Sequence, residues 1–249
     1  LENAVTYVEQ RRFSHRDRKE NKIARKVAPG EAPIQPGRET QIDSRAIHVC
    51  QPPVCQFSQG MRISGGHARG IKLAAPKGGA VRPAMDGLRE AVFSSLGDRV
   101  RGACFLDLFA GTGAYGLEAL SRGADGGLWV EKHRKTFELL RRNIAAVCVS
   151  LQRDETGLMV RCGDASLAPW PDDELPPDLV FVDPPYPLIP KLAPKIFASL
   201  KQLLRRRDDP LVVFEMPGDL VLTPRGFEMV KRLGRGRDQP CVVIYRLEP

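Results

Sequence analysis

The residues best suited to chemistry are Asp183, Pro184, Pro185 and Tyr186, which follow the apolar run Leu179–Val182. An amino group conjugated to a ring is a poor nucleophile because its lone pair is delocalised into the ring. Two acceptors that hold both of its protons favour a tetrahedral nitrogen. Asp183 offers a carboxylate, Pro184 offers a carbonyl held by two rigid rings, and Tyr186 offers a face for stacking a base. We expect these four residues to form a catalytic site for the exocyclic amine of a base.

A glycine turn lies upstream, in the sequence Leu-Asp-Leu-Phe-Ala-Gly-Thr-Gly over residues 106–113. Gly111, Gly113 and Gly116 have the spacing of a nucleotide-binding turn, in which glycine lets the backbone approach a ligand closely. This spacing alone would equally suit a nicotinamide cofactor. Asp107 argues against that cofactor, because an acid before the turn repels a pyrophosphate and attracts a cationic amino-acid moiety.

Two further acids follow successive strand-like runs. Glu131 is placed to accept hydrogen bonds from both hydroxyls of a ribose, and Asp164 to accept a hydrogen bond from an adenine amino group. Each acid could instead cap the helix that follows it. With Asp107 and the glycine turn, they favour S-adenosylmethionine, whose methyl group would lie in line with the amine nitrogen. This chemistry requires no metal and no covalent intermediate.

These motifs need a scaffold that brings strand ends together, and the hydrophobic pattern predicts one. Strand-like and helical runs alternate, which predicts a doubly wound α/β domain with a mainly parallel, seven-stranded sheet whose crevice lies at the carboxyl ends of the strands. The last two strands are joined tightly, so we expect an antiparallel last strand. The expected strands are Ala103–Phe109, Gly127–Val130, Leu158–Cys162, Leu179–Val182, Leu211–Phe214, Phe227–Arg232 and Cys241–Leu247. The expected helices are Pro83–Leu96, Ala114–Arg122, Arg134–Val147 and Leu188–Leu204.

Residues 61–82 form a short basic segment before this domain. The segment holds five basic residues and no acidic one, in two alternating runs around a glycine-containing connection. This pattern predicts a β-hairpin, either simply solvated or acting as an arm that grips phosphates. On the second reading, Arg62, Arg69 and Lys72 bind nucleic acid. We therefore expect a flexible polar extension over 1–60, a hairpin arm over 61–82 and a catalytic domain over 83–249.

Composition narrows the class of partner. The net charge of +8 favours an anionic partner. No apolar run is long enough to span a membrane and no secretory signal is evident, so we expect a cytoplasmic protein without a membrane partner. His48, Cys50 and Cys55 could ligate a metal, but no second ligand pair follows at finger spacing, and free thiols are the simpler interpretation. We expect a monomer that holds no metal.

The order of these motifs resembles the RsmD family of bacterial 16S ribosomal RNA (guanine-N2)-methyltransferases. The motifs that carry the resemblance are Met61–Gly66, Arg69-Gly70, Arg82–Asp86, Asp107–Gly113, Leu117–Ala124, Val130–Lys132 and Asp183–Tyr186. The resemblance implies a Rossmann-like class I methyltransferase fold and methyl transfer to N2 of a guanine, in free 16S RNA or in an assembling 30S subunit. It also implies ten cofactor-binding positions: Arg82, Pro83, Asp107, Phe109, Gly111, Gly113, Glu131, Lys132, Asp164 and Ala165. Ala84-Met85 stands where the family commonly has two hydroxyl residues, and residues 1–60 lie outside the match.

Other functions share parts of this pattern. A DNA amino-methyltransferase acting on adenine N6 or cytosine N4 has the same Asp-Pro-Pro-Tyr motif, but it usually needs a target-recognition domain larger than any insertion here. A protein-glutamine methyltransferase generally has Asn at the first position. A non-catalytic RNA-binding protein would not need an intact Asp183, Gly111 and Glu131. A nicotinamide dehydrogenase is disfavoured by Asp107.

Overall fold

The structure is a computed structural model that describes residues 61–76, 83–234, 236, 237 and 239–248. The expected extension over 1–60, the metal ligands considered at His48, Cys50 and Cys55, and the expected cofactor contact Arg82 lie outside the described residues. None of the described helices is long and apolar enough to cross a membrane.

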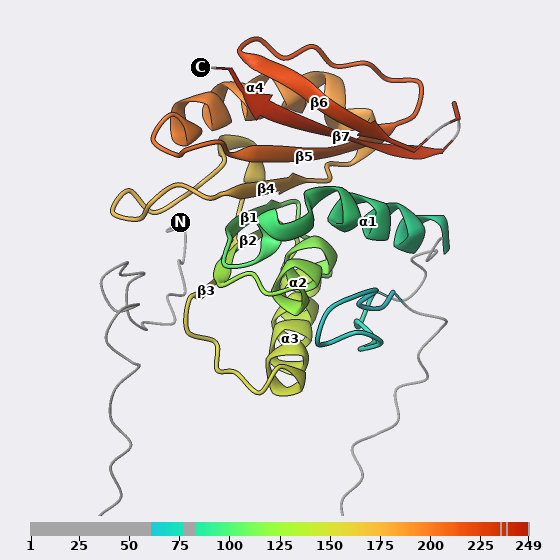
Figure 1. The fold of residues 1–249 in the computed structure, drawn as a ribbon, viewed down its shortest axis with the longest axis vertical. Coiled ribbons are helices and arrows are strands. Elements are labelled where there is room, and N and C mark those ends of the chain that lie inside the picture. The colour runs from blue at the N-terminus through green and yellow to red at the C-terminus, as the bar shows by residue number, and fades with distance from the viewer. Residues whose placement is uncertain (1–60, 77–82, 235, 238, 249) are drawn as a thin grey trace, which may run out of the picture. The chain divides into compact units, whose positions relative to one another are not determined.

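A seven-stranded sheet forms the centre of the fold, in the order β3-β2-β1-β4-β5-β7-β6 (Figure 1). Neighbours among the first five strands pair in parallel, while β7 runs antiparallel to both β5 and β6. The predicted doubly wound fold with an antiparallel last strand is therefore confirmed. The strands are β1 Cys104–Leu108, β2 Gly126–Glu131, β3 Leu158–Cys162, β4 Leu179–Val182, β5 Leu211–Pro217, β6 Phe227–Leu233 and β7 Pro240–Leu247.

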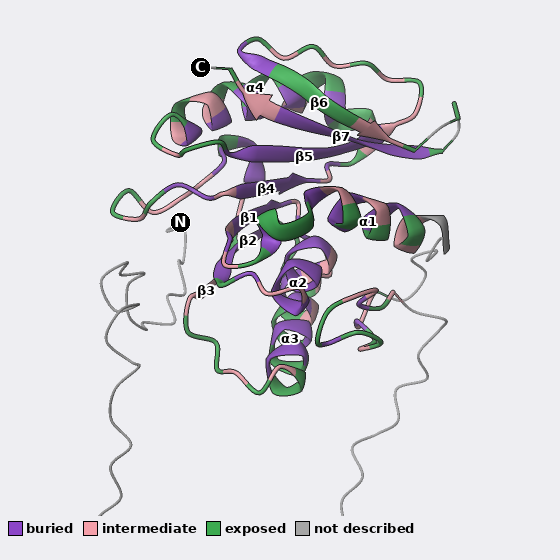
Figure 2. Ribbon diagram, viewed as in Figure 1, coloured by how far each residue is buried: buried purple, intermediate pink, exposed green. Residues whose placement is uncertain are grey.

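Helices cover both faces of the sheet, which explains why its central strands are apolar on both sides (Figure 2). The helices α1 (Pro83–Leu96), α2 (Ala114–Ser121) and α3 (Arg134–Ser150) share one hydrophobic core with the sheet, and α4 (Ile189–Leu204) shares the other. Side chains alternate across a strand, so Phe105, Phe181 and Val213 lie in the first core, and Leu106, Val180 and Val212 in the second. Short 3₁₀ turns occur at Gly97–Val100, Ala165–Leu167 and Tyr186–Leu188.

The segment 61–76 folds back on itself and packs on the first core. Arg62 and Lys72 form an antiparallel bridge, and the backbone N–H of Leu73 donates to the carbonyl of Met61 at 2.8 Å. Ile63 and Leu73 are buried in the core. The segment is thus anchored to the domain by its apolar side chains, while its role as an RNA-binding arm stays a prediction.

Candidate active site

Three carboxyl groups lie on one face of the sheet in adjacent strands. The parallel register pairs Asp107 of β1 with Phe181 of β4, and Val182 of β4 with Phe214 of β5. One step along, Asp183 and Glu215 are therefore neighbours, and both share the face of Asp107 because side chains alternate. This is the face covered by α1, α2 and α3. Like charges this close oppose one another's ionisation.

Asp107 is buried, and its carboxylate accepts a hydrogen bond from the backbone N–H of Gly116 at 3.0 Å. Desolvation raises the pKa of Asp107 from 3.8 to about 7, the bond from Gly116 lowers it, and the nearby Glu131 raises it. The carboxyl group thus sits under the first turn of α2 and does not line the cavity described below. Its predicted contact with the cofactor stays a prediction.

Asp107, Asp183 and Glu215 together form an acidic row, and Asp183, which is only partly exposed, lies at its centre. Desolvation of its carboxyl group raises its pKa well above 3.8, and the carboxylates of Glu215 and Asp107 raise it further. Glu215 accepts hydrogen bonds from the hydroxyls of Tyr115 at 2.8 Å and Tyr186 at 3.3 Å. Burial raises the pKa of Glu215, while the two tyrosine hydrogen bonds lower it. The site therefore combines two carboxyl groups with a tyrosine ring fixed at its hydroxyl end.

The glycine turn has the backbone that its sequence predicts. Phe109, at the end of β1, has a φ of 60°, a conformation that is strained for a non-glycine residue and is often found at functional sites. Gly111 and Gly113 have φ values of 56° and 87°. A Cβ on Gly116 would lie 2.3 Å from the indole nitrogen of Trp129, so this glycine permits close packing of α2 on the sheet.

The two remaining acids are held by backbone N–H groups. Glu131 accepts from Gly111 N at 2.9 Å and from His133 N at 2.6 Å, which fixes both carboxylate oxygens. Asp164 accepts from Ser166 N at 2.9 Å, and this bond lowers the pKa of Asp164. Asp164 thus caps the short turn that follows it, as the simpler interpretation expects. Each oxygen retains a lone pair for a ligand, so the caps do not exclude a second role.

A cavity of about 850 Å³ joins these groups. It brings together nine of the predicted site residues: Phe109, Glu131, Lys132, Asp164, Ala165, Asp183, Pro184, Pro185 and Tyr186. Asp107, Gly111 and Gly113 do not line it, and neither do the predicted RNA-binding residues Arg62, Arg69 and Lys72. Pro83 begins α1.

The sequence reasoning missed several residues that line the cavity: Met61, Ala75, Pro76, Met85, Thr112, His133, Leu188, Leu192 and Glu215. Glu215 was missed because the strand was expected to end at Phe214, whereas β5 continues to Pro217. A glutamate inside the run Val-Val-Phe-Glu-Met was the available signal, since a buried strand seldom carries an acid without a reason.

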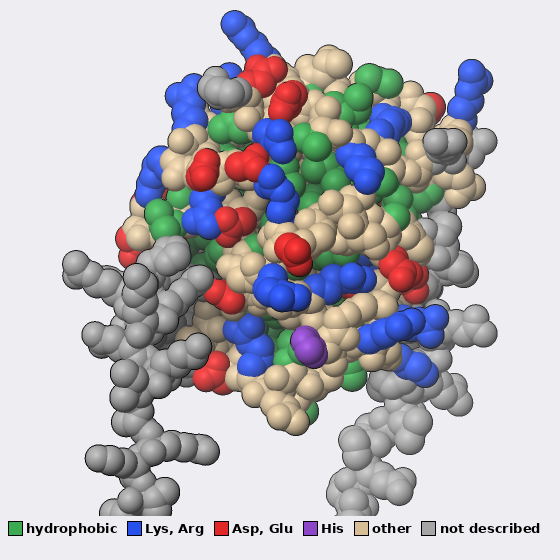
Figure 3. All heavy atoms as spheres, in the orientation of Figure 1, with side chains coloured by type: hydrophobic (Ala, Val, Ile, Leu, Met, Phe, Trp, Pro, Cys, Tyr) green, Lys and Arg blue, Asp and Glu red, His purple; other side chains and the backbone are tan. Residues whose placement is uncertain are grey.

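The predicted RNA-binding residues lie on the molecular surface. Arg62, Arg69 and Lys72 are exposed, and within the described residues none of them forms a salt bridge. Figure 3 shows Lys and Arg side chains across the whole of the drawn face, including its lower part, the region where Figure 1 places α2, α3 and the 61–76 segment. Basic side chains free of ion pairs suit contact with phosphates.

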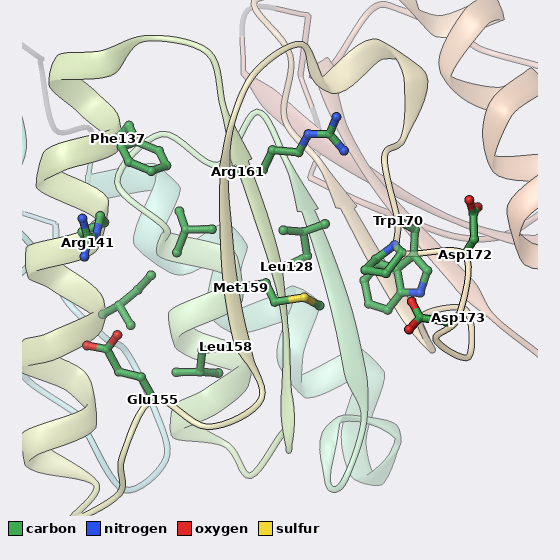
Figure 4. A pocket seen from close by; sticks show the side chains of 13 residues that line it. Leu128, Phe137, Arg141, Glu155, Leu158, Met159, Arg161, Trp170, Asp172 and Asp173 are labelled. Carbon is green, nitrogen blue, oxygen red and sulfur yellow. The ribbon is translucent and has the colours of Figure 1, made fainter. Parts of the chain in front are cut away.

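A second cavity, of about 620 Å³, surrounds the edge strand β3 (Figure 4). Phe137 and Arg141 of α3 lie on one side of the strand, and Met159 and Trp170 on the other. The indole N–H of Trp170 donates to the carbonyl of Leu175 at 3.1 Å. None of the predicted cofactor or substrate residues lines this cavity.

Relatives of the chain share its fold. "Ribosomal RNA small subunit methyltransferase D" of Escherichia coli K12 is 36% identical over 126 residues, or 51% of this chain and 60% of that protein. The match thus spans less than two thirds of that relative. The solved structure of yhhF from Escherichia coli has a TM-score of 0.61 and 30% identity, covering 76% of this chain and 98% of that one. The solved structure of a hypothetical protein from Thermus thermophilus has a TM-score of 0.56 and 29% identity, and the match covers 76% of this chain and 99% of that chain.

The family comparison agrees with the fold and with the motifs. The family model described as "Conserved hypothetical protein 95" matches residues 61–244, which contain the glycine turn, the acidic row and the Asp-Pro-Pro-Tyr motif. With its class I methyltransferase fold, the chain belongs to this family, the RsmD family.

Proposed function

We propose that the protein is an S-adenosylmethionine-dependent methyltransferase that modifies the exocyclic N2 amine of a guanine in 16S ribosomal RNA. The observation that carries the proposal is the single cavity shared by Asp183–Tyr186 and the acids Glu131 and Asp164. One end of it offers acceptors for an amine and the other offers acceptors for a nucleoside. The Escherichia coli relative named as a ribosomal RNA methyltransferase supports RNA as the substrate.

The residues of the cavity fit this cofactor. Glu131 is only 6% exposed, and its carboxylate is held in place by two backbone N–H groups, as suits a residue that binds a ribose diol. Phe109, Ala165 and Leu188 add apolar surface for an adenine ring. When bound, the cofactor would supply the electrophilic methyl group.

The protein's own contribution is to position and activate the amine. Asp183 and the carbonyl of Pro184 hold its two protons, which localises the nitrogen lone pair. Tyr186 stacks on the base, with its hydroxyl held by Glu215. The rate gain then comes from alignment and from electrostatic stabilisation of the developing charge on the nitrogen. We propose that the enzyme acts in the cytoplasm, as a monomer, on assembling 30S subunits.

The test is transfer of tritium from labelled S-adenosylmethionine to free 16S RNA, 30S particles and duplex DNA, followed by nucleoside analysis. N2-methylguanosine from RNA or from 30S particles is the expected product. N6-methyladenine or N4-methylcytosine in DNA would keep the chemistry and overturn the substrate. Transfer to none of the three, with the cofactor still bound, would favour a protein substrate.

A variant separates chemistry from folding. Asp183→Ala should abolish transfer and leave cofactor binding within a few-fold of the wild type, since Asp183 acts on the amine. Binding of labelled cofactor measures the second quantity. Transfer that persists in the variant would remove Asp183 from the mechanism, and loss of both properties would indicate misfolding.

A further inference from the structure

A second carboxyl group, Glu215, lines the cavity beside Asp183. It follows Phe214, the register partner of Val182, so Glu215 within β5 and Asp183 directly after β4 are neighbours on the same face of the sheet. Glu215 is 2% exposed, and within the described residues it forms no salt bridge. A carboxylate buried in this way is costly unless a ligand supplies donors.

The partners of Glu215 satisfy only part of its capacity. Tyr115 donates to one oxygen at 2.8 Å and Tyr186 donates to the other at 3.3 Å. Both donors are neutral, and Arg89, whose positive charge lowers the pKa of Glu215, forms no salt bridge with it within the described residues. A carboxylate has about four acceptor positions, so the oxygen that faces Tyr186 can take another donor.

The bases differ in what lies next to the exocyclic amine. In guanine the neighbouring ring nitrogen, N1, carries a proton, so the edge presents a row of donors. In adenine and in cytosine the neighbouring ring nitrogen is an acceptor with no proton. A carboxylate beside the amine therefore attracts N1–H of guanine and repels the unprotonated ring nitrogen of adenine or cytosine. Specificity often depends on such repulsion.

We propose that Glu215 determines the choice of base by accepting a hydrogen bond from N1–H of guanine while Asp183 and the carbonyl of Pro184 accept hydrogen bonds from the N2 amine. This inference rests on the proposed function and adds the residue that selects guanine. Tyr115 and Tyr186 keep the carboxylate in place. The three donors of the guanine edge then meet three acceptors contributed by β5 and by the turn after β4.

The test uses an RNA oligonucleotide that contains the nucleotide mapped by nucleoside analysis, with guanine or 2-aminopurine at that position. 2-Aminopurine keeps the amine, but its N1 is an acceptor. The wild type should favour guanine in kcat/KM by at least about tenfold, the scale of one good base-specific contact. In Glu215→Gln the amide can donate to N1 of 2-aminopurine, so the guanine preference should fall about tenfold.

Glu138→Gln, at an exposed position on α3, is the matched control. It makes the same carboxylate-to-amide change away from the cavity, so the preference for guanine should persist. An equal loss of both substrates in Glu215→Gln would overturn the inference, because the residue would then have only a structural role. So would weaker binding of labelled cofactor with an unchanged base preference, which would assign the carboxylate to the cofactor.

The outcomes also distinguish this inference from the proposed function. If the wild type produces N2-methylguanosine and the Glu215→Gln preference is unchanged, only the inference fails. If the wild type methylates adenine N6 or cytosine N4, both fail, since a base with an acceptor beside its amine would then be bound next to Glu215.

Discussion

The buried carboxylate of Glu118 on α2 accepts a hydrogen bond from the backbone N–H of Ser64 at 2.7 Å. It also accepts from Gly65 N at 2.8 Å, and it forms ion pairs with Arg122 at 2.8 Å and Arg89 at 3.5 Å. One acid thus joins the segment 61–76 to two helices. Because Met61 lines the cavity, this anchor also fixes part of the cavity wall.

Removal of this anchor should destabilise the protein. Glu118→Ala leaves Asp86 as the carboxylate partner of the buried Arg89 guanidinium, and it leaves the backbone N–H groups of Ser64 and Gly65 without their acceptor, which typically costs about 1–3 kcal/mol per buried group. Urea unfolding measures the loss, and faster tryptic cleavage at Arg62 and Arg69 would report release of the segment. Glu138→Ala, at an exposed position on α3, is the control and should change the free energy of unfolding by less than about 0.5 kcal/mol. Equal effects of the two variants would contradict this account.

Two glycines of the glycine turn, Gly111 and Gly113, should respond differently to alanine. Both have positive φ, which costs an L residue about 1–2 kcal/mol. A Cβ at Gly113 would also lie 2.4 Å from a Leu140 methyl group, whereas at Gly111 the nearest atom is 3.9 Å away. Gly113→Ala should therefore lose roughly 1–3 kcal/mol more than Gly111→Ala in the free energy of unfolding. The reverse order would show that the turn rearranges on substitution.

The sequence predicted the scaffold well because the signals there are strong and local. The strands Leu158–Cys162 and Leu179–Val182 and the helix Pro83–Leu96 have the predicted bounds. Apolar runs between turn residues, and a proline at a helix start, depend little on tertiary context. The order of the last strands in the sheet could not be predicted from the sequence. The expectation of an antiparallel last strand does not by itself place β7 between β5 and β6.

Side-chain direction within the site was harder to predict. The position of Asp107 before the turn could be read from sequence, but its hydrogen bond to Gly116 depends on how α2 packs on the sheet. Tyr115 packs in the core, where its ring stacks on Phe181 with ring centroids 5.3 Å apart. Its hydroxyl also binds Glu215, a partner 100 residues away that only the folded sheet brings near.

The basic surface residues should bind RNA through phosphates. Charge reversal at Arg62, Arg69 and Lys72 should weaken RNA binding and lower the slope of log Kd against log salt by about one unit per lost phosphate contact. Filter binding over a salt series measures this slope. Reversal at three exposed bases elsewhere, Arg205, Arg206 and Lys231, is the control and should have a smaller effect. Unchanged affinity of the first variant would exclude the segment 61–76 from RNA binding.

The acidic row should set the pH dependence of transfer. The ionised Asp183 is the stronger acceptor for the amine, so kcat/KM should fall as the pH drops through the pKa of Asp183 in the free enzyme. Desolvation raises that pKa well above 3.8, and the charge of Glu215 raises it further. The acid limb, the part of the pH profile in which kcat/KM falls on acidification, should therefore lie at a higher pH than an ordinary aspartate would give. Glu215→Gln removes one negative charge and should therefore move the limb to lower pH. Initial rates at limiting RNA, with Glu138→Gln as the exposed control, measure the shift. A limb that stays in place or moves to higher pH would show that Asp183 does not control it.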